Sequence, residues 1–308
     1  MTATNSPKFT FFYLLSLVGL IFTTISSGMI LFQIINKFVP DPLIPGMLVD
    51  MNALKFAISA ILIAAPLYFV LSWLILKSLR NGELEADSAI RRWLHYFVML
   101  VTAVVGFGWF VTTVLDFFNG DLSLKIGLKS LTAILLAGLV FSYYFFSIRT
   151  AESFEQKRKA VNIYFYGSII LVAALFVVSL FIVDSPATTR ARRQDEANIS
   201  KLYNIKNQID FYYETNKKLP ANLDELIGDV YHLQPETLEN MVTKKKFEYK
   251  IISKDTYEIC TDFQLSNKAV DNNDSYSLGK DEWPHDSGYQ CVKQKAVSVN
   301  MPAFDLKR

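Results

Sequence analysis

Two cysteines, Cys260 and Cys291, carry the clearest chemical signal in this sequence of 308 residues. Both lie in the polar stretch that ends the chain, and the apolar stretches before it contain none. A pair confined to one polar domain is typical of a disulfide formed outside the cytosol. Two unrelated buried thiols are the alternative. A zinc site is less favoured, because there is no C-x-x-C and the histidines of this stretch lack ligand spacing.

A short run of oxygen-bearing side chains at 271–275 suggests a weak calcium site, with Asp271, Asn273 and Asp274 as candidate ligands. An EF-hand loop needs glycine at its sixth position, where this chain has Tyr276, and a bidentate glutamate at its twelfth, which is missing. Nearby acidic residues could add ligands, but a solvated loop is the simpler interpretation.

No arrangement of residues predicts catalysis. The sequence lacks a Ser-His-Asp pattern, a carboxylate pair and a phosphate-binding loop. His95 lies beside aromatic residues at the start of an apolar segment, which favours a place at the membrane interface over a haem ligand or proton relay. We expect no cofactor and no resident metal. The 31 basic and 29 acidic residues nearly balance, which argues against nucleic acid as a partner.

Five apolar segments precede the polar stretch, and each is long enough to cross a bilayer, which takes about 20 residues in a helix. They are Phe11–Ile35, Lys55–Leu76, Leu94–Leu115, Ile126–Phe146 and Ile163–Val183. The first exceeds the apolar core of a signal peptide, so we expect an uncleaved helix. The fold class is therefore five transmembrane helices (domain 1–184) followed by a small α+β domain (185–308).

The distribution of Lys and Arg predicts the orientation, because cytoplasmic loops are enriched in positive charge. The N-terminus and the loops after the second and fourth segments are richer in Lys and Arg than the other two loops. This pattern places the N-terminus in the cytoplasm and, after five crossings, the C-terminal domain outside the cytoplasmic membrane. Arg190, Arg192 and Arg193 follow the fifth segment and run against the pattern, but long domains are translocated largely regardless of charge.

Within the apolar segments, the notable residues suggest packing. Charged residues occur only near segment ends, which disfavours ion-coupled transport. Pro66 predicts a kink in the second segment. Gly106 and Gly108 in the third, and Ala133 and Ala137 in the fourth, are small residues that would let helix backbones approach closely. A substrate cavity at the glycines is the less favoured alternative.

The stretch from Arg91 to Arg149 resembles a bacterial multi-helix membrane family that is known only as a domain of unknown function, family 5671. The matching points are Arg91-Arg92-Trp93, the NGDLS turn at 119–123, Lys129, Tyr143-Tyr144 and Arg149. The resemblance extends over about residues 11–149. It implies a four-helix membrane unit and no particular activity.

The polar stretch reads as one long helix followed by strands. Asp184-Ser185-Pro186 is a helix start signal, and apolar residues follow at three- and four-residue steps to about Asn216. Alternating apolar residues at 247–251 and 257–263, separated by a short turn, predict a β-hairpin. Tyr289–Val299 predicts a third strand. Such an order is an α+β arrangement.

This order resembles the globular part of type IV pilins and of the major pseudopilin of type II secretion. The matching residues are Arg193, Asp195, Leu202, Ile205 and Tyr213, then Leu219-Pro220, Leu223 and Leu226, and finally Tyr249, Tyr257 to Cys260, Trp283, His285, Gly288 and Cys291. The resemblance implies an exported domain with a disulfide-tied tail. Before the fifth segment the chain lacks the leader glycine and membrane glutamate of pilins, so we do not expect a filament subunit.

Three functions follow as expectations, in order of preference. The leading hypothesis is a membrane-anchored interaction or assembly protein, whose partners are the lipid bilayer and proteins of the envelope or of the secretion or pilus machinery. The alternative is a small-molecule transporter or channel with an accessory outer domain. A membrane enzyme is third. A cavity between the helices would favour the transporter, and a tightly packed bundle would favour the interaction protein.

Overall fold

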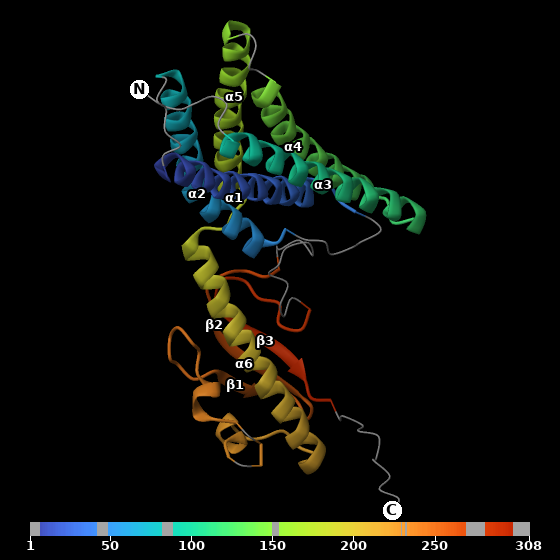
Figure 1. The fold of residues 1–308 in the computed structure, drawn as a ribbon. Coiled ribbons are helices and arrows are strands. Elements are labelled where there is room, and N and C mark those ends of the chain that lie inside the picture. Colours follow the sequence, from blue (N-terminus) through green and yellow to red (C-terminus); the bar gives the residue numbers. More distant parts are fainter. Residues whose placement is uncertain are drawn as a thin grey trace, which may run out of the picture. The chain divides into compact units, whose positions relative to one another are not determined.

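The computed structural model describes residues 7–41, 49–81, 89–149, 154–228, 230–231, 233–268 and 281–297. The chain divides into two compact units, Met1–Val183 and Asp184–Arg308. The first unit consists of helices, and the second combines helix and sheet (Figure 1).

The described residues of the first unit form five helices that are long and apolar enough to cross a membrane. They are α1 (Pro7–Phe38), α2 (Met51–Arg80), α3 (Ala89–Asn119), α4 (Leu124–Arg149) and α5 (Phe154–Leu180). The four first apolar segments of the sequence lie wholly inside α1 to α4. The fifth was predicted to reach Val183, but α5 ends at Leu180 and residues 181–183 form a turn.

Helices α1, α2 and α5 share one apolar core of the helical unit. Ile30 of α1 and Leu54 of α2 are fully buried in a core to which α5 contributes Leu175. Asp50 caps α2 by accepting hydrogen bonds from the backbone N–H groups of residues 52 and 53. Such caps satisfy donors that the first turn of a helix leaves free. Pro66 lies inside α2, which continues past it to Arg80.

Large apolar side chains cover the outside of the helical unit. On α3, Phe107 and Phe118 are 71% and 78% exposed. Soluble proteins rarely expose apolar surface on this scale. Exposure of this kind along a whole helix is what a lipid-facing surface requires.

In the second unit, α6 (Pro186–Asn216) is a single long helix (Figure 1). It begins as predicted: Ser185 accepts a hydrogen bond from the Thr188 N–H, and Pro186 occupies the first turn. It ends where Lys217 adopts a left-handed conformation and donates its N–H to the Tyr213 carbonyl. Two 3-10 turns follow, η2 (Leu223–Leu226) and η3 (Pro235–Leu238).

The sheet has three antiparallel strands in the order β1 (Glu248–Ile251), β2 (Thr256–Phe263) and β3 (Gly288–Lys295). The predicted hairpin is β1–β2, with Tyr249 opposite Ile259. The third strand was predicted to reach residue 299 but ends at Lys295. Directly after it, the Ala296 N–H bonds to the Asp255 carbonyl at the turn between β1 and β2.

One apolar core joins α6 to the sheet and the 3-10 turns. The predicted stripe of α6 lies in it, since Leu202, Ile205 and Ile209 are at most 1% exposed. Tyr257 of β2 and Trp283 before β3 are fully buried in the same core. The sheet therefore buries one face against α6, as the alternating pattern of β2 requires.

Candidate functional site

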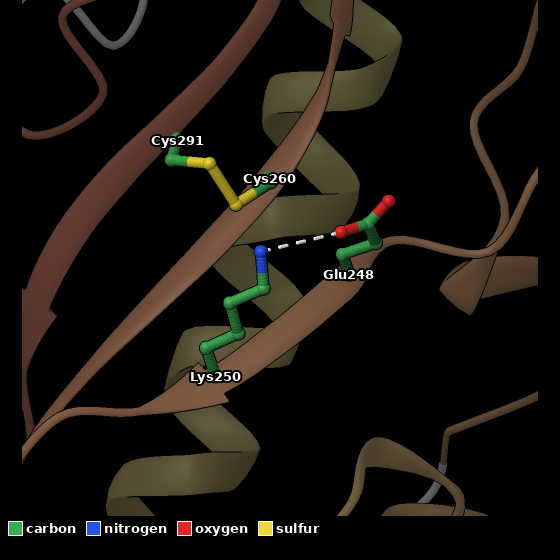
Figure 2. Close-up of a disulfide and its surroundings, with 4 residues drawn as sticks. All are labelled: Glu248, Lys250, Cys260 and Cys291. Atoms are coloured by element: carbon green, nitrogen blue, oxygen red, sulfur yellow. Dashed lines mark ion pairs between the residues drawn. A yellow bond between two sulfur atoms is a disulfide. The ribbon is translucent and has the colours of Figure 1, made fainter.

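The two cysteines are joined by a disulfide in the second unit. Cys260 of β2 lies directly opposite Cys291 of β3 in the strand register, and the bond closes a separation of 31 residues (Figure 2). Cys260 is buried and Cys291 is exposed. Beside the bond, Lys250 and Glu248 of the edge strand β1 form an exposed ion pair of 3.5 Å. The disulfide thus ties two neighbouring strands and holds no reactive thiol.

The candidate calcium ligands Asp271, Asn273 and Asp274 lie outside the described residues. Of the acidic residues nearby, Asp286 forms a 2.7 Å ion pair with Lys268 and accepts a hydrogen bond from Ser266. Among the residues that the structure describes, no three His, Cys, Asp or Glu side chains are grouped so that they could hold a metal ion.

The small residues of α3 and α4 differ in their roles. Ala137 is buried, and a Cβ on Gly106 would lie 4.0 Å from the Ala137 Cβ, so this pair allows α3 and α4 to pack closely. Ala133 is half-buried on the same helix. The prediction was wrong for Gly108, which is exposed and has nothing within 4 Å of its missing Cβ, because it lies on the outer face of α3.

His95 is buried inside the helical unit, near the start of α3, and its place at the membrane interface stays a prediction. Its Nδ1 lies 2.8 Å from the Arg91 carbonyl oxygen and its Nε2 lies 3.2 Å from the Ser147 hydroxyl. A carbonyl only accepts, so in the neutral ring Nδ1 donates and Nε2 accepts from Ser147. The ring also packs edge-on against Tyr144 at 4.9 Å. The sequence could not reveal Ser147 as its partner, 52 residues away.

A polar cluster surrounds His95 at the end of the bundle where α1 and α3 begin and α2 and α4 end. Arg91 donates from Nη2 to the Ser147 hydroxyl at 3.2 Å, which links α3 to α4. Tyr13 of α1 is 8% exposed, and among the described residues its buried hydroxyl has no hydrogen-bond partner. Tyr68 of α2 hydrogen-bonds to Ser72 and Tyr144.

Two adjoining cavities open from this cluster. The smaller, about 60 Å³, is lined by Tyr13, Arg91, His95 and Ser147 together with apolar residues of α1, α2 and α3. The larger, about 280 Å³, lies between α1, α2, α4 and α5 and is lined mainly by apolar side chains. Tyr68, Tyr143 and Tyr144 line both. These cavities lie away from Gly106 and Gly108, around aromatic residues of which Tyr143 and Tyr144 were noted from the sequence only as points of the family resemblance.

His285 is a buried histidine in the second unit. Its Nδ1–H donates to the Trp283 carbonyl at 2.7 Å, and its ring stacks on Phe263 with 3.7 Å between ring centroids. Burial lowers the pKa of His285, although the Trp283 hydrogen bond and the nearby carboxylates oppose this shift. The side-chain amide of Asn267 fixes the backbone of residues 283–285. It accepts a hydrogen bond from the His285 N–H and donates one to the Trp283 carbonyl. These contacts fix the position of the His285 ring in the α+β unit.

The fold and these sites define a protein of five bilayer-length helices joined to a disulfide-tied α+β unit. Residues 10–144 match the family model described as domain of unknown function DUF5671. This range takes in α1, α2, α3 and most of α4, including Tyr13, Arg91, His95 and Tyr144. No curated protein and no solved structure matches the chain. The family match therefore agrees with the predicted resemblance for the helical unit and assigns no activity.

Proposed function

We propose that this chain is a multi-pass protein of the cytoplasmic membrane that acts by interaction or assembly, with its α+β unit outside the cell membrane. The disulfide Cys260–Cys291 is the observation that carries the proposal. Such bonds persist in oxidising compartments and are rare in the cytosol. An odd number of crossings then leaves the N-terminus in the cytoplasm, which agrees with the distribution of Lys and Arg in the loops.

The proposed role of the α+β unit is docking to proteins of the envelope or of the secretion or pilus machinery. Support comes from the order of its elements, one long helix followed by an antiparallel sheet with a disulfide, which is the order of a pilin globular domain. Some buried polar side chains of the unit stabilise its own fold. Asp195, for example, accepts hydrogen bonds from the backbone N–H groups of Gln264 and Leu265 at 2.8–3.0 Å.

Cysteine labelling tests the orientation. In a chain with both native cysteines replaced by alanine, Glu83→Cys probes the loop after α2, and Lys254→Cys probes the turn between β1 and β2. An impermeant maleimide on cells with a permeabilised outer membrane should label position 254 and leave position 83 unlabelled until the cytoplasmic membrane is disrupted. Labelling at position 83 but not at position 254 would show the opposite orientation.

Native complexes test the docking role. The full chain and a chain ending at Val183, each tagged at the N-terminus, would be solubilised mildly and compared by native electrophoresis. The full chain should migrate in a larger complex that the shortened chain has lost, while both remain in the membrane fraction. Migration of both as single protomers would refute a stable docking partner for the α+β unit.

The cavity between α1, α2, α4 and α5 supports a second candidate, a small-molecule transporter or channel, in which the α+β unit is accessory. A cavity of about 280 Å³ approaches the range of small-molecule sites, about 300–1,000 Å³. Flux of polar solutes through liposomes that contain the purified chain would favour this candidate. Liposomes no leakier than empty ones would leave the interaction protein as the sole proposal.

A further inference from the structure

We propose that the larger cavity of the helical unit holds one acyl chain of a membrane phospholipid, which enters sideways between α4 and α5. The inference rests on the part of the proposed function that places this unit in a bilayer. It does not depend on the polar cluster around His95 or on what the α+β unit binds.

The first observation is that hydroxyl groups on the cavity wall are already hydrogen-bonded within their own helices. In α1, Thr23 donates to the Gly19 carbonyl and Ser27 donates to the Thr23 carbonyl, each at 2.7 Å. In α5, Ser168 donates to the Phe165 carbonyl at 2.8 Å. A polar ligand would lose its hydration here and find these donors in use, which is costly. The wall therefore favours hydrocarbon.

The second observation is that hydrogen bonds between helices hold the wall together. Tyr164 of α5 donates to the Ser142 hydroxyl of α4 at 3.4 Å. Tyr68 of α2 hydrogen-bonds to Tyr144 of α4. Contacts within the protein thus form the cavity, as is usual for a preformed ligand site.

The third observation is where the cavity opens. Its lining includes Leu139 of α4 and Ile163 and Leu171 of α5, which are 47%, 71% and 41% exposed. The cavity is therefore accessible at the outer surface between α4 and α5. Leu139 lies near the middle of α4, at the depth of the hydrocarbon core of a bilayer. Acyl chains already surround this opening, whereas a water-soluble ligand would first have to cross lipid.

The size of the cavity fits part of one chain. Its volume, about 280 Å³, is roughly twice that of an engineered apolar cavity of about 150 Å³ that binds benzene. A segment of one acyl chain can fill this space while the rest of the lipid stays in the bilayer. Inside, the chain contacts α1, α2, α4 and α5. Because dispersion contacts add up, it should bind more tightly than a lipid on the open outer face of α3.

Photolabelling of the full-length protein, purified in mild detergent, tests the proposal. The probes are phosphatidylglycerol and phosphatidylcholine, each with a diazirine midway along one acyl chain. Peptide mapping should find label at Leu136 and Val172 of the lining, saturating at one probe per chain. Label at Phe107, which is 71% exposed on α3, should rise in proportion to the probe. The two headgroups should label alike, because the cavity recognises the chain.

Three results would overturn the proposal. The first is label at the lining that rises in proportion to the probe, as on α3. The second is saturable label with only one of the two headgroups. The third is saturable label with a diazirine fatty acid but with neither phospholipid.

A matched pair of glycines locates the site. Nothing lies within 4 Å of the missing Cβ at Gly167 or at Gly138, but only Gly167 belongs to the cavity lining. In Gly167→Leu the saturable label should fall by about tenfold, as expected when an added side chain overpacks a bound chain. Gly138→Leu should label like the unaltered protein. Equal label in the two variants would refute the assigned site, and the unaltered protein decides the proposal if a variant fails to fold.

Carbonate extraction of cell membranes separates this proposal from the proposed function. The chain should stay in the membrane pellet. Release by carbonate would overturn the membrane placement and the lipid site with it. Retention in the pellet, together with label at the lining that does not saturate, would overturn the lipid site alone.

Discussion

Gly19 of α1 faces Tyr68 of α2 so closely that a Cβ at position 19 would lie 3.1 Å from the Tyr68 Cβ and 3.2 Å from its Cα. Helices that pack without a hydrophobic driving force rely on such small residues at their contacts. The nearest atoms are the backbone N and Cα and the side-chain Cβ of Tyr68, and a change of rotamer cannot move them out of the way. Gly19 therefore sets the spacing between α1 and α2.

Replacing Gly19 with leucine should destabilise the helical unit by overpacking, by about 1–3 kcal/mol. The thermal unfolding of the purified chain in detergent measures this loss. Gly108→Leu is the control, because nothing lies within 4 Å of the missing Cβ there. An equal change in melting temperature for the two variants would contradict the close approach of α1 and α2.

In the α+β unit, Ile209→Ala should lower the free energy of unfolding by about 2–5 kcal/mol, since Ile209 is fully buried between α6 and the sheet. Urea unfolding of the α+β unit 184–308 measures it. Phe211→Ala, on the same helix but 41% exposed, should cost less. A larger loss at Phe211 than at Ile209 would show that α6 packs through its other face.

The disulfide should stabilise the α+β unit by roughly 3–4 kcal/mol, as the chain-entropy account gives for a loop of about 30 residues. Dithiothreitol should lower the urea midpoint of the unit toward that of the double variant Cys260→Ala and Cys291→Ala. The double variant itself should not respond to the reductant. Two free thiols in peptide maps of exported protein would remove both the bond and its support for the proposed orientation.

The stability of the α+β unit should fall as the pH drops below about 6.5 because of His285. Burial lowers its pKa in the folded state, so below its ordinary value of 6.5 the unfolded chain binds more protons than the folded one. Its stabilising contribution is therefore complete above that pH and is lost on acidification toward the folded-state pKa. Free energies of unfolding measured between pH 7.5 and 5.5 give the slope.

His285→Gln is the comparison, because glutamine retains an N–H donor but does not titrate in this range. The slope between pH 7.5 and 5.5 should be shallower in this variant. His232 is present in both proteins, so its contribution cancels in the comparison. An unchanged slope would mean that His285 does not determine the acid sensitivity of the unit.

The sequence by itself determined the elements. Apolar runs of bilayer length predicted the five helices of the first unit, and the three- and four-residue steps at Leu202, Ile205 and Ile209 predicted the buried stripe of α6. These signals are local, because each helix or strand must present apolar residues at its own period. The sequence also indicated the disulfide, since only two cysteines were available to pair.

Only the tertiary structure decided which side chains meet. It put Arg91 and His95 against Ser147 across more than 50 residues and placed Tyr13 beside them. It also assigned the close approach to Gly19 and not to Gly108. A periodic pattern fixes the face on which a residue lies. It does not fix the rotation and spacing of neighbouring helices, which depend on how all their side chains pack at once.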